Sequence, residues 1–338
     1  MQNLAPDRVR LSVADARELS ERALRSIGYD AEEARIIADH VVDAALCGYE
    51  YSGLAKILNI VESRKFRNPR RPMSALRETA VSILYDGGNN VGMLAVYRAA
   101  QTAVVKAQQH GFALVGVTNS WMSGRSAHYV ELIARAGLVG IHSVSSTHQV
   151  APHGGARAAL GTNPIAFGFP TDHNPLIIDL GTSAFMATDL KFRKRLDGLL
   201  PEGVAIDAQG RPTRDPALAQ LGALLPFGGH KGFALALAMD ALGVLAGSGF
   251  DVDKTYGYLI IAIKPDLLVP LDEFKRHLSD AIARIKATPC QPGFDEIRIP
   301  SERTFRERAR SLREGIVIDR RIYDALHDLI KSAGSEPG

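Results

Sequence analysis

The stretch from Leu224 to Gly247, "LLPFGGHKGFALALAMDALGVLAG", changes in residue composition at Lys231. Its first residues include a proline and two adjacent glycines, a composition typical of a turn. From Lys231 onward, alanine and leucine fill most positions, so a helix over this segment is apolar on almost every face. Its small side chains allow close approach to another layer. We therefore expect a helix over 231–247 that is buried against a β-sheet.

The strands of that sheet are predicted from short β-branched runs on either side of this helix in the sequence. Each run is broken by Gly, Pro, Asn or Ser and has the length of a strand. The runs cover residues 112–120, 138–146, 163–171, 175–183 and 256–265. A helix over 127–137 is predicted after the first of them. The middle of the chain is therefore rich in β-structure.

The two ends of the chain predict helices. Ser12 can cap a helix that ends at Gly28, and Asp30 can cap a second one that ends at Gly48. A short strand over 80–87 leads into a further helical pattern, and three more helices are predicted near the carboxyl terminus. Their ranges are 93–111, 270–287, 301–315 and 319–334. We expect the ends to pack together as a helical terminal lobe, residues 1–111 plus 297–338, around a second lobe of residues 112–296.

Composition narrows the class of protein. The net charge is only +3, and the basic run Ser63–Arg71 is better explained as a solvated loop than as a nucleic-acid surface. The two cysteines, Cys47 and Cys290, give no disulfide framework and no zinc motif. No apolar run has the length of a membrane span. We expect a cytoplasmic protein that binds neither nucleic acid nor membrane.

The common cofactor and metal motifs are missing. No G-x-G-x-x-G follows a strand and opens a helix, and no P-loop or H-E-x-x-H occurs. His148 and His153 lie close together in sequence without carboxylate neighbours, so a structural or surface role is favoured over metal binding. These absences disfavour a Rossmann dehydrogenase and a zinc enzyme.

Five segments are both glycine-rich and polar, and their order along the chain is informative. They are Ala151–Thr171, Ile177–Met186, Leu200–Pro216, Leu224–Leu237 and Arg298–Arg303. Together they resemble the malate/L-lactate dehydrogenase family of the second, non-Rossmann type, over about residues 11–329. The resemblance implies a mixed, largely antiparallel α/β sheet lobe beside a helical lobe, a homodimer, and an active site in a cleft between the lobes.

The resemblance also implies NAD(H) or NADP(H) as cofactor, bound with the substrate in the lobe 112–296. Charged and hydroxyl side chains near a helix start can hold a diphosphate. The implied cofactor-binding residues are Asn119, Ser120, Ser123, Gly124, Asp179, Leu180, Gly181, Thr182, Ser183, His230, Lys231, Arg298, Pro300, Ser301, Glu302 and Arg303.

The turn after the second helix departs from the family pattern. Family members carry Gly-x-Asp-Ser-His-Gly-x-x-Arg there, with histidine as the acid/base and arginine on the substrate carboxylate. Here Tyr51 replaces the serine, Ser52 the histidine and Lys56 the arginine. The supporting aspartate of the family is matched to Asp189, and a substrate-side threonine to Thr162. A second family histidine is replaced by methionine, near Met122.

These departures leave three functions open. The first is an NAD(P)-dependent oxidoreductase of small 2-oxo or 2-hydroxy carboxylates, with Ser52, Tyr51, Lys56 and Asp189 as catalytic residues and Lys56 and Thr162 on the substrate. The second is a reductase of cyclic 2-imino acids, because a protonated imine needs no external acid and serine is a far weaker acid than imidazole. The third is a catalytically silent homologue that only binds the cofactor.

Overall fold

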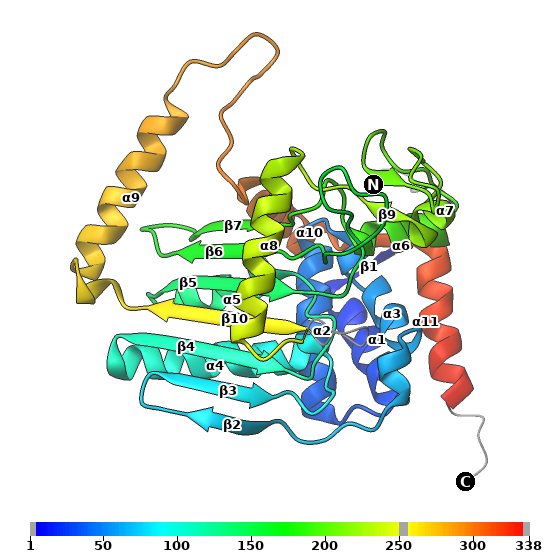
Figure 1. Ribbon diagram of the computed structural model, residues 1–338, viewed down its shortest axis with the longest axis horizontal. Helices are drawn as coiled ribbons and strands as arrows, with labels where there is room; N and C mark the ends of the chain where they lie inside the picture. The colour runs from blue at the N-terminus through cyan, green and yellow to red at the C-terminus, as the bar shows by residue number, and fades with distance from the viewer. Residues whose placement is uncertain (1–4, 250–255, 334–338) are drawn as a thin grey trace.

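Seven strands form one mixed sheet in the computed structural model, which describes residues 5–249 and 256–333. Their order is β2-β3-β4-β10-β5-β6-β7, and all neighbours are antiparallel except β3 and β4 (Figure 1). The strands are β2 (Ser74–Glu78), β3 (Ser82–Asp86), β4 (Phe112–Thr118), β5 (Val139–Ser145), β6 (Ile165–Phe169), β7 (Leu176–Leu180) and β10 (Gly257–Ile263). The predicted strands and the mixed, largely antiparallel fold class are confirmed.

Helices cover both faces of this sheet. Figure 1 shows α8 (His230–Leu245) in front, with α4 (Gly92–His110) and α5 (Ser126–Arg135) behind. Helix α4 packs through alanines that are fully buried, among them Ala99 and Ala103, so its backbone comes close to the strands. Glycine at position 111 then ends α4 with a left-handed backbone, φ +83°.

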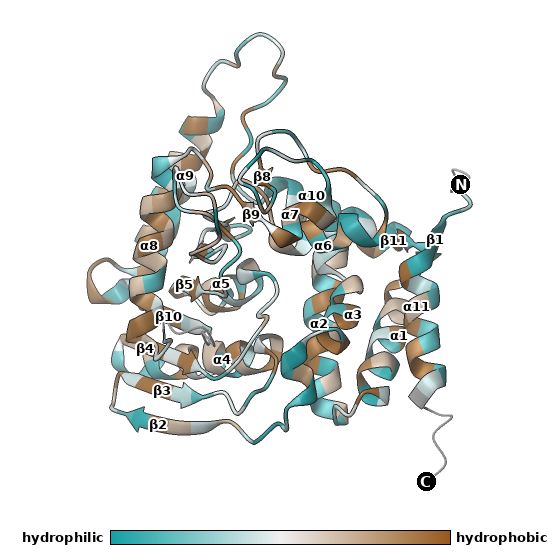
Figure 2. Ribbon diagram, turned by 45° about the vertical axis from the view of Figure 1, so that its right-hand side comes forward, coloured by the Kyte–Doolittle hydropathy of each residue, from teal (hydrophilic) through white to brown (hydrophobic). Residues whose placement is uncertain are grey.

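The opening stretch forms α8 as predicted, but only one face of the helix is buried. That face packs against β5 and β10. On the opposite face Leu237 and Val244 are 55% and 46% exposed. The expected burial against the sheet is therefore confirmed for one face, while the other face leaves an apolar helix at the surface of the chain (Figure 2).

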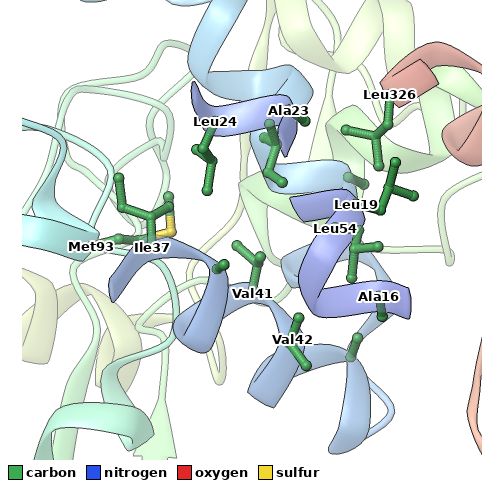
Figure 3. Close-up of a cluster of buried hydrophobic side chains, with 14 of the residues drawn as sticks. Ala16, Leu19, Ala23, Leu24, Ile37, Val41, Val42, Leu54, Met93 and Leu326 are labelled. Atoms are coloured by element: carbon green, nitrogen blue, oxygen red, sulfur yellow. The ribbon is translucent and has the colours of Figure 1, made fainter. Parts of the chain in front are cut away.

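The helical lobe joins the two ends of the chain. Strand β1 (Arg8–Leu11) pairs with β11 (Ile316–Asp319), and helices of both ends share one core (Figure 3). Leu19, Val41 and Leu326 meet there, each nearly or fully buried. The helices are α1 (Val13–Ser26), α2 (Ala31–Leu46), α3 (Ala55–Val61) and α11 (Arg320–Ala333). The predicted packing of the ends is confirmed.

Local capping explains why the first two helices begin where they do. The Ser12 side chain accepts a hydrogen bond from the Asp15 N–H. Asp30 and Glu33 form a full capping box at the start of α2. Both caps were predicted from the sequence and are confirmed.

The strand pairing bears on where one lobe ends and the next begins. The predicted boundary at residue 111 separates β2, β3 and α4 from the sheet that they join or cover. We propose a boundary near residue 72 instead, which leaves 5–72 and the final segment from 297 in the helical lobe. Residues 1–4 and 334–338 lie outside the described chain.

A small subdomain covers the end of the sheet near the helical lobe. It contains two-residue strands β8 (Ala205–Ile206) and β9 (Ala223–Leu224), with helices α6 (Ala187–Arg195) and α7 (Pro216–Leu221). Helix α9 (Leu271–Lys286) instead extends away from the body (Figure 1), and α10 (Glu302–Glu314) returns the chain to the helical lobe. Among the described helices, none has the length and apolar character needed to cross a membrane.

Candidate active site

Two adjoining cavities lie where the helical lobe meets the sheet. The first, about 350 Å³, we call the lysine chamber; Lys56, Trp121, Thr162 and Lys191 are among its walls. The second, about 490 Å³, we call the tyrosine chamber; its walls include Tyr49, Tyr51 and Ser52 with the loops 179–181 and 300–301. Both chambers are lined by Gly124, Pro164, Met186 and Thr188, so they form one continuous cleft.

The turn from Gly48 to Gly53 is held from outside the cleft. A Cβ at Gly48 would lie 2.9 Å from the Glu307 side chain, and the φ of +78° also favours glycine. Glu50 accepts hydrogen bonds from the Arg8 guanidinium at 2.8 Å and from the Asp319 N–H at 2.6 Å. The turn is thereby tied to the β1–β11 pair, while Tyr51 and Ser52 line the tyrosine chamber.

Lys56 lies at the start of α3 and faces the lysine chamber, with only 5% of its surface exposed. Its Nζ donates a hydrogen bond to Thr188 Oγ1 at 3.0 Å, and it has no carboxylate partner among the described residues. Burial, and after it the charge of Lys191, lowers the pKa of Lys56 to about 7. A buried ammonium group without a counter-ion favours an anion in this chamber.

The predicted catalytic residues Ser52, Tyr51 and Asp189 are not joined to one another by hydrogen bonds. Within the described chain, the hydroxyls of Ser52 and Tyr51 have no hydrogen-bond partner, and Asp189 lines neither chamber. The Asp189 carboxylate accepts from Arg193 Nε at 3.3 Å. Burial, with Tyr49 and Asp189 nearby, raises the pKa of Tyr51, so its phenol keeps its proton and can donate.

Thr162 lines the lysine chamber with Lys56, and its predicted role in substrate binding stays a prediction. Its carbonyl accepts hydrogen bonds from the backbone N–H and the hydroxyl of Thr182, at 2.9 and 3.0 Å. The loop after β7 is therefore fastened directly to the segment that carries Thr162.

Part of the predicted cofactor set lies in the cleft. Ser123 and Gly124 line the lysine chamber, and a second group lines the tyrosine chamber: Asp179, Leu180, Gly181, Pro300 and Ser301. The others line neither chamber: Asn119, Ser120, Thr182, Ser183, His230, Lys231, Arg298, Glu302 and Arg303.

Several residues of this last group shape the loops instead. Asn119 Nδ2 donates to Asp86 at 2.7 Å, and the Ser120 hydroxyl donates to the Asn90 carbonyl at 2.7 Å. The Arg303 guanidinium lies 5.2 Å from the centre of the Tyr49 ring, beside the tyrosine chamber. His230 and Lys231 are exposed at the start of α8, and their part in cofactor binding stays a prediction.

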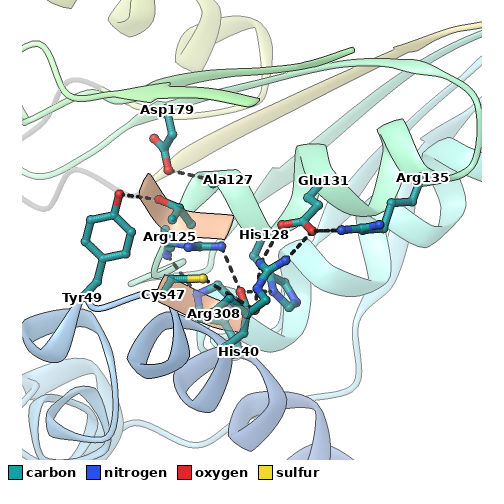
Figure 4. Close-up of polar contacts among 12 residues, drawn as sticks. His40, Cys47, Tyr49, Arg125, Ala127, His128, Glu131, Arg135, Asp179 and Arg308 are labelled. Atoms are coloured by element: carbon teal, nitrogen blue, oxygen red, sulfur yellow. Dashed lines mark hydrogen bonds and ion pairs between the residues drawn. The ribbon is translucent and has the colours of Figure 1, made fainter. Parts of the chain in front are cut away.

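A buried ionic cluster, which the sequence did not predict, lies beside the tyrosine chamber, whose wall includes one of its residues, Arg125 (Figure 4). Arg125 Nη2 and Arg308 Nη2 each lie 2.9 Å from an oxygen of Asp43, and Arg308 also pairs with Glu131 at 2.7 Å. Three helices, α2, α5 and α10, are joined in this way. We call these four residues, Asp43, Arg125, Glu131 and Arg308, the ionic cluster.

His40, on α2, supports the turn at Gly124 and Arg125. Burial lowers its pKa well below the ordinary value, so the ring is neutral and its Nε2 accepts the Arg125 N–H at 2.9 Å. Gly124, with φ +74°, passes so close that a Cβ there would fall 2.2 Å from this nitrogen. The turn shared by both chambers therefore requires glycine at position 124.

The residues around the tyrosine chamber fit a phosphate-bearing ligand. Ser126 Oγ and the Nε and Nη1 atoms of Arg125 are buried without hydrogen-bond partners in the described structure. Unpaired donors of this kind suit phosphate oxygens. The Ala127 N–H at the start of α5 is already taken, because Asp179 accepts it at 2.7 Å. Side-chain donors are thus better placed than that amide for a diphosphate.

Three basic residues of the lysine chamber were not selected from the sequence. Lys191 comes from α6, and Arg64 and Lys65 belong to the run that was interpreted as a solvated loop. Only the fold brings α6 and this loop to the same cavity. The one sequence feature that could have pointed to Lys191 is its place two residues after Asp189, and this spacing alone is weak evidence for a site residue.

Comparison with known proteins matches nearly the whole chain. A family model described as malate/L-lactate dehydrogenase matches residues 11–327. A malate/(S)-sulfolactate dehydrogenase of Methanothermus fervidus is 31% identical, over 94% of this chain and 96% of that protein. A delta(1)-pyrroline-2-carboxylate reductase of Burkholderia ambifaria is 33% identical, over 95% and 97%. The solved structure of sulfolactate dehydrogenase from Methanocaldococcus jannaschii superposes with a TM-score of 0.84 at 30% identity, over 96% of this chain and 98% of that one.

Proposed function

Because the chain belongs to the malate/L-lactate dehydrogenase family, we propose that it is a nicotinamide-dependent oxidoreductase of a small 2-oxo or 2-hydroxy carboxylate. The observation that carries this proposal is Lys56, a buried ammonium group without a carboxylate partner that faces a cavity of small-molecule size. The test is a screen of purified protein against 2-oxo acids and cyclic imines, with oxidation of NADH or NADPH followed by absorbance. Failure to oxidise either cofactor with any of these substrates would refute the proposal.

Lys56 and Thr162 hold the substrate in this proposal. The Lys56 ammonium binds the carboxylate, and the Thr188 hydroxyl already orients Nζ from 3.0 Å away. Lysine keeps the charge of the family's arginine but lacks its two-pronged geometry, so Thr188 supplies part of the lost orientation. Thr162, fastened to the loop after β7, offers a hydroxyl at the same wall.

The cofactor, NAD(H) or NADP(H), supplies or accepts a hydride when it is bound. Asp179, Gly181, Pro300 and Ser301 would hold it from the loops of the tyrosine chamber, with Ser126 and Arg125 as donors to its phosphates. Arg303 stands beside this chamber over the Tyr49 ring. Tyr51 remains protonated and can donate a hydrogen bond there.

Cofactor binding should be visible through Trp121, the only tryptophan of the chain. It lines the lysine chamber and is 3% exposed, with its indole N–H donated to the Asn89 carbonyl. We predict that NADH or NADPH quenches its fluorescence and that Trp121→Phe removes the signal without removing binding. Absence of heat in calorimetry with either cofactor at millimolar concentration would contradict this prediction.

A second candidate, reduction of a cyclic 2-imino acid, is favoured by one observation. Ser52 stands where the family places its histidine acid, and its hydroxyl has no hydrogen-bond partner among described residues. A ketone takes up a proton on oxygen as hydride arrives at carbon, whereas a protonated imine does not. The role of Ser52 therefore separates the two candidates.

We predict that Ser52→Ala lowers kcat on a ketone substrate by up to about a hundredfold, the lower end of a general-acid contribution, because a serine hydroxyl is a far weaker acid than imidazole. Folding should be little affected, because Gly48 and Gly53 set the backbone of the turn. On a protonated imine the same change should have almost no effect. The measurements are kcat and the unfolding temperature of the wild type and the variant. Full activity of Ser52→Ala on a confirmed ketone would exclude Ser52 and shift the role to Tyr51 or Lys56.

We also propose that the protein is a cytoplasmic homodimer. Both cysteines, Cys47 and Cys290, are free thiols, as suits a reducing compartment. Helix α9 is amphipathic, yet none of its residues is buried in one chain. It stands beside the sheet (Figure 1), on the side of the molecule where α8 exposes its apolar face. A second copy of the chain can cover both helices.

The dimer predicts a specific response to charge on α8. Leu237 and Val244 are seven positions apart, so they lie on one face of the helix. Leu237→Asp combined with Val244→Asp should convert the dimer to a monomer in light scattering. Val105→Asp is the control, because Val105 is also exposed, at 52%, but lies on α4. A monomeric wild type would contradict the proposed dimer.

A further inference from the structure

The surroundings of Lys56 offer little of what stabilises an ammonium ion. Its side chain faces the lysine chamber with 5% of its surface exposed, and apolar side chains of Met122, Val144 and Met186 line the same chamber. An ammonium group has three N–H donors, but among the described residues Nζ has one hydrogen-bond partner, Thr188 Oγ1 at 3.0 Å. Burial of this kind favours the neutral amine over the charged form.

The charged groups that face Lys56 do not reverse this preference. Lys191 on α6 is exposed and adds a like charge, and Arg64 and Lys65 add two more basic side chains to the chamber wall. The one acid of that wall, Glu62, lies near Lys191 and is itself paired with an arginine at 2.7 Å. Burial, and after it the charge of Lys191, therefore lowers the pKa of Lys56 to about 7.

The other titratable groups near Lys56 bring no negative charge to it. His40 on α2 is neutral because burial lowers its pKa, and the phenol of Tyr256 keeps its proton because burial raises its pKa. The Asp189 carboxylate accepts from Arg193 instead. Near pH 7, about half of the Lys56 side chains are thus uncharged amines, each with an available lone pair.

A desolvated lysine amine close to another cation is a nucleophile toward carbonyl carbon. The 2-oxo acid of the proposed function carries its carbonyl carbon directly beside its carboxylate. When the ammonium form of Lys56 binds this carboxylate, Nζ therefore lies next to the carbonyl carbon as well. Loss of a proton from Nζ then leaves an amine beside a ketone in a cavity of about 350 Å³.

We propose that Lys56 is also a covalent site, whose amine forms a reversible imine with the carbonyl carbon of a 2-oxo acid. This activity goes beyond hydride transfer and needs no nicotinamide. It takes from the proposed function only that a 2-oxo acid enters the lysine chamber.

The reaction balances without any further reactant. The Nζ lone pair forms the new C–N bond, and the electrons of the C=O double bond move to oxygen. A proton passes from nitrogen to this oxygen, for which the Thr188 hydroxyl at 3.0 Å from Nζ is a suitable carrier. The C–O bond then breaks, and the oxygen leaves as water with a second proton. In sum, ammonium and ketone become iminium and water, and nothing is oxidised or reduced.

The test is reductive trapping without any nicotinamide. The protein is incubated at pH 7 with pyruvate and sodium cyanoborohydride, which reduces an iminium to a stable amine, and its peptides are mapped by mass spectrometry. A 1-carboxyethyl group is expected on Lys56, formed at least about tenfold faster than on Lys231, an exposed lysine on α8. Lactate, which has no carbonyl group at carbon 2, should give no adduct.

Two controls separate nucleophilic attack from burial and from charge. Lys106 is the matched lysine within the same chain, because its side chain is only 12% exposed but is paired with Glu78 at 2.8 Å. It should remain unlabelled. Lys56→Arg keeps the positive charge and cannot form an imine, so this variant should still bind pyruvate in calorimetry while labelling at position 56 disappears.

The outcomes distinguish this inference from the proposed function. Labelling of Lys56 in a protein that does not oxidise NADH or NADPH would support the covalent site and refute the oxidoreductase. An unlabelled Lys56 in a protein that reduces 2-oxo acids would refute the covalent site and leave the oxidoreductase standing. Labelling that follows exposure, with Lys231 modified faster than Lys56, would also overturn the inference, and it requires no variant to fold.

Discussion

Replacing Lys56 with methionine lowers kcat/KM for a 2-oxo acid by at least about tenfold, while cofactor affinity barely changes. Methionine keeps much of the buried apolar stem of Lys56 but removes the charge that binds the carboxylate. Steady-state kinetics and Trp121 quenching measure the two effects separately. Equal losses of substrate and cofactor binding would show instead that Lys56 supports the fold of the cleft.

The pH profile gives the same residue a second test. Because burial lowers the pKa of Lys56 to about 7, the free enzyme loses this positive charge as the pH rises through that value. Carboxylate binding needs the charged form, so kcat/KM should fall as the pH rises above about 7. In Lys56→Met the fall should vanish. A profile that is identical in both proteins would exclude Lys56 as the titrating group.

Replacing Arg308 with methionine should lower the free energy of unfolding by about 3 kcal/mol, because it leaves buried carboxylates of the ionic cluster without their partner. Arg308 pairs with Asp43 at 2.9 Å and with Glu131 at 2.7 Å, and all three side chains are mostly buried. Urea denaturation measures the loss. The matched control on the same helix is Arg310→Met, whose exposed pair with Glu307 should contribute less than about 1 kcal/mol.

The ionic cluster also makes stability sensitive to acid. Burial alone raises the pKa of Asp43, but the hydrogen bond with His128 and the charges of Arg125 and Arg308 outweigh it and hold the pKa well below its usual range. This contribution is complete above the ordinary carboxyl pKa of about 4 and is lost as the pH falls below it. Asp43→Asn should reduce this acid sensitivity. Unchanged pH dependence of unfolding in that variant would contradict the assignment.

The elements that sequence could predict are those fixed by local chemistry. Ser12 and Asp30 mark the starts of α1 and α2 because their side chains bond to amides three residues on. The β-branched runs became strands of the sheet for a similarly local reason, since side-chain shape favours extended backbone. The pairing of β1 with β11 joins residues about 300 positions apart, and no local pattern contains it.

Long-range packing also determines how much of α8 is buried. Composition predicted a helix that is buried against the sheet and apolar on almost every face, and Leu237, on the face away from the sheet, is more than half exposed. The sequence indicates that the surface of this helix is apolar. It does not indicate whether the same chain or a second copy covers that surface. In the proposed dimer, the second copy of the chain covers the exposed apolar face of α8.

The residues of the cleft could likewise be predicted only in part from the sequence. Tyr51, Ser52, Lys56 and Thr162 were found through the family resemblance, and all four line the two chambers. Lys191 was missed because α6 and α3 meet only in the folded chain. Asp189 was matched by sequence position, but its carboxylate is directed to Arg193. Matching a motif locates a turn, whereas the fold decides which side chains of that turn face the substrate.

The most direct measurement is deuterium transfer from a reduced nicotinamide cofactor labelled at carbon 4 of its ring. The protein is incubated with oxaloacetate and NADH or NADPH deuterated on each face in turn, and the product is analysed by mass spectrometry. Hydride transfer in this cleft predicts one deuterium at carbon 2 of the hydroxy acid from one face only, formed at an initial rate at least about tenfold lower in Lys56→Met. Product without deuterium from either face, or an unchanged rate of labelled product in Lys56→Met, would contradict hydride transfer to a 2-oxo acid whose carboxylate is held by Lys56.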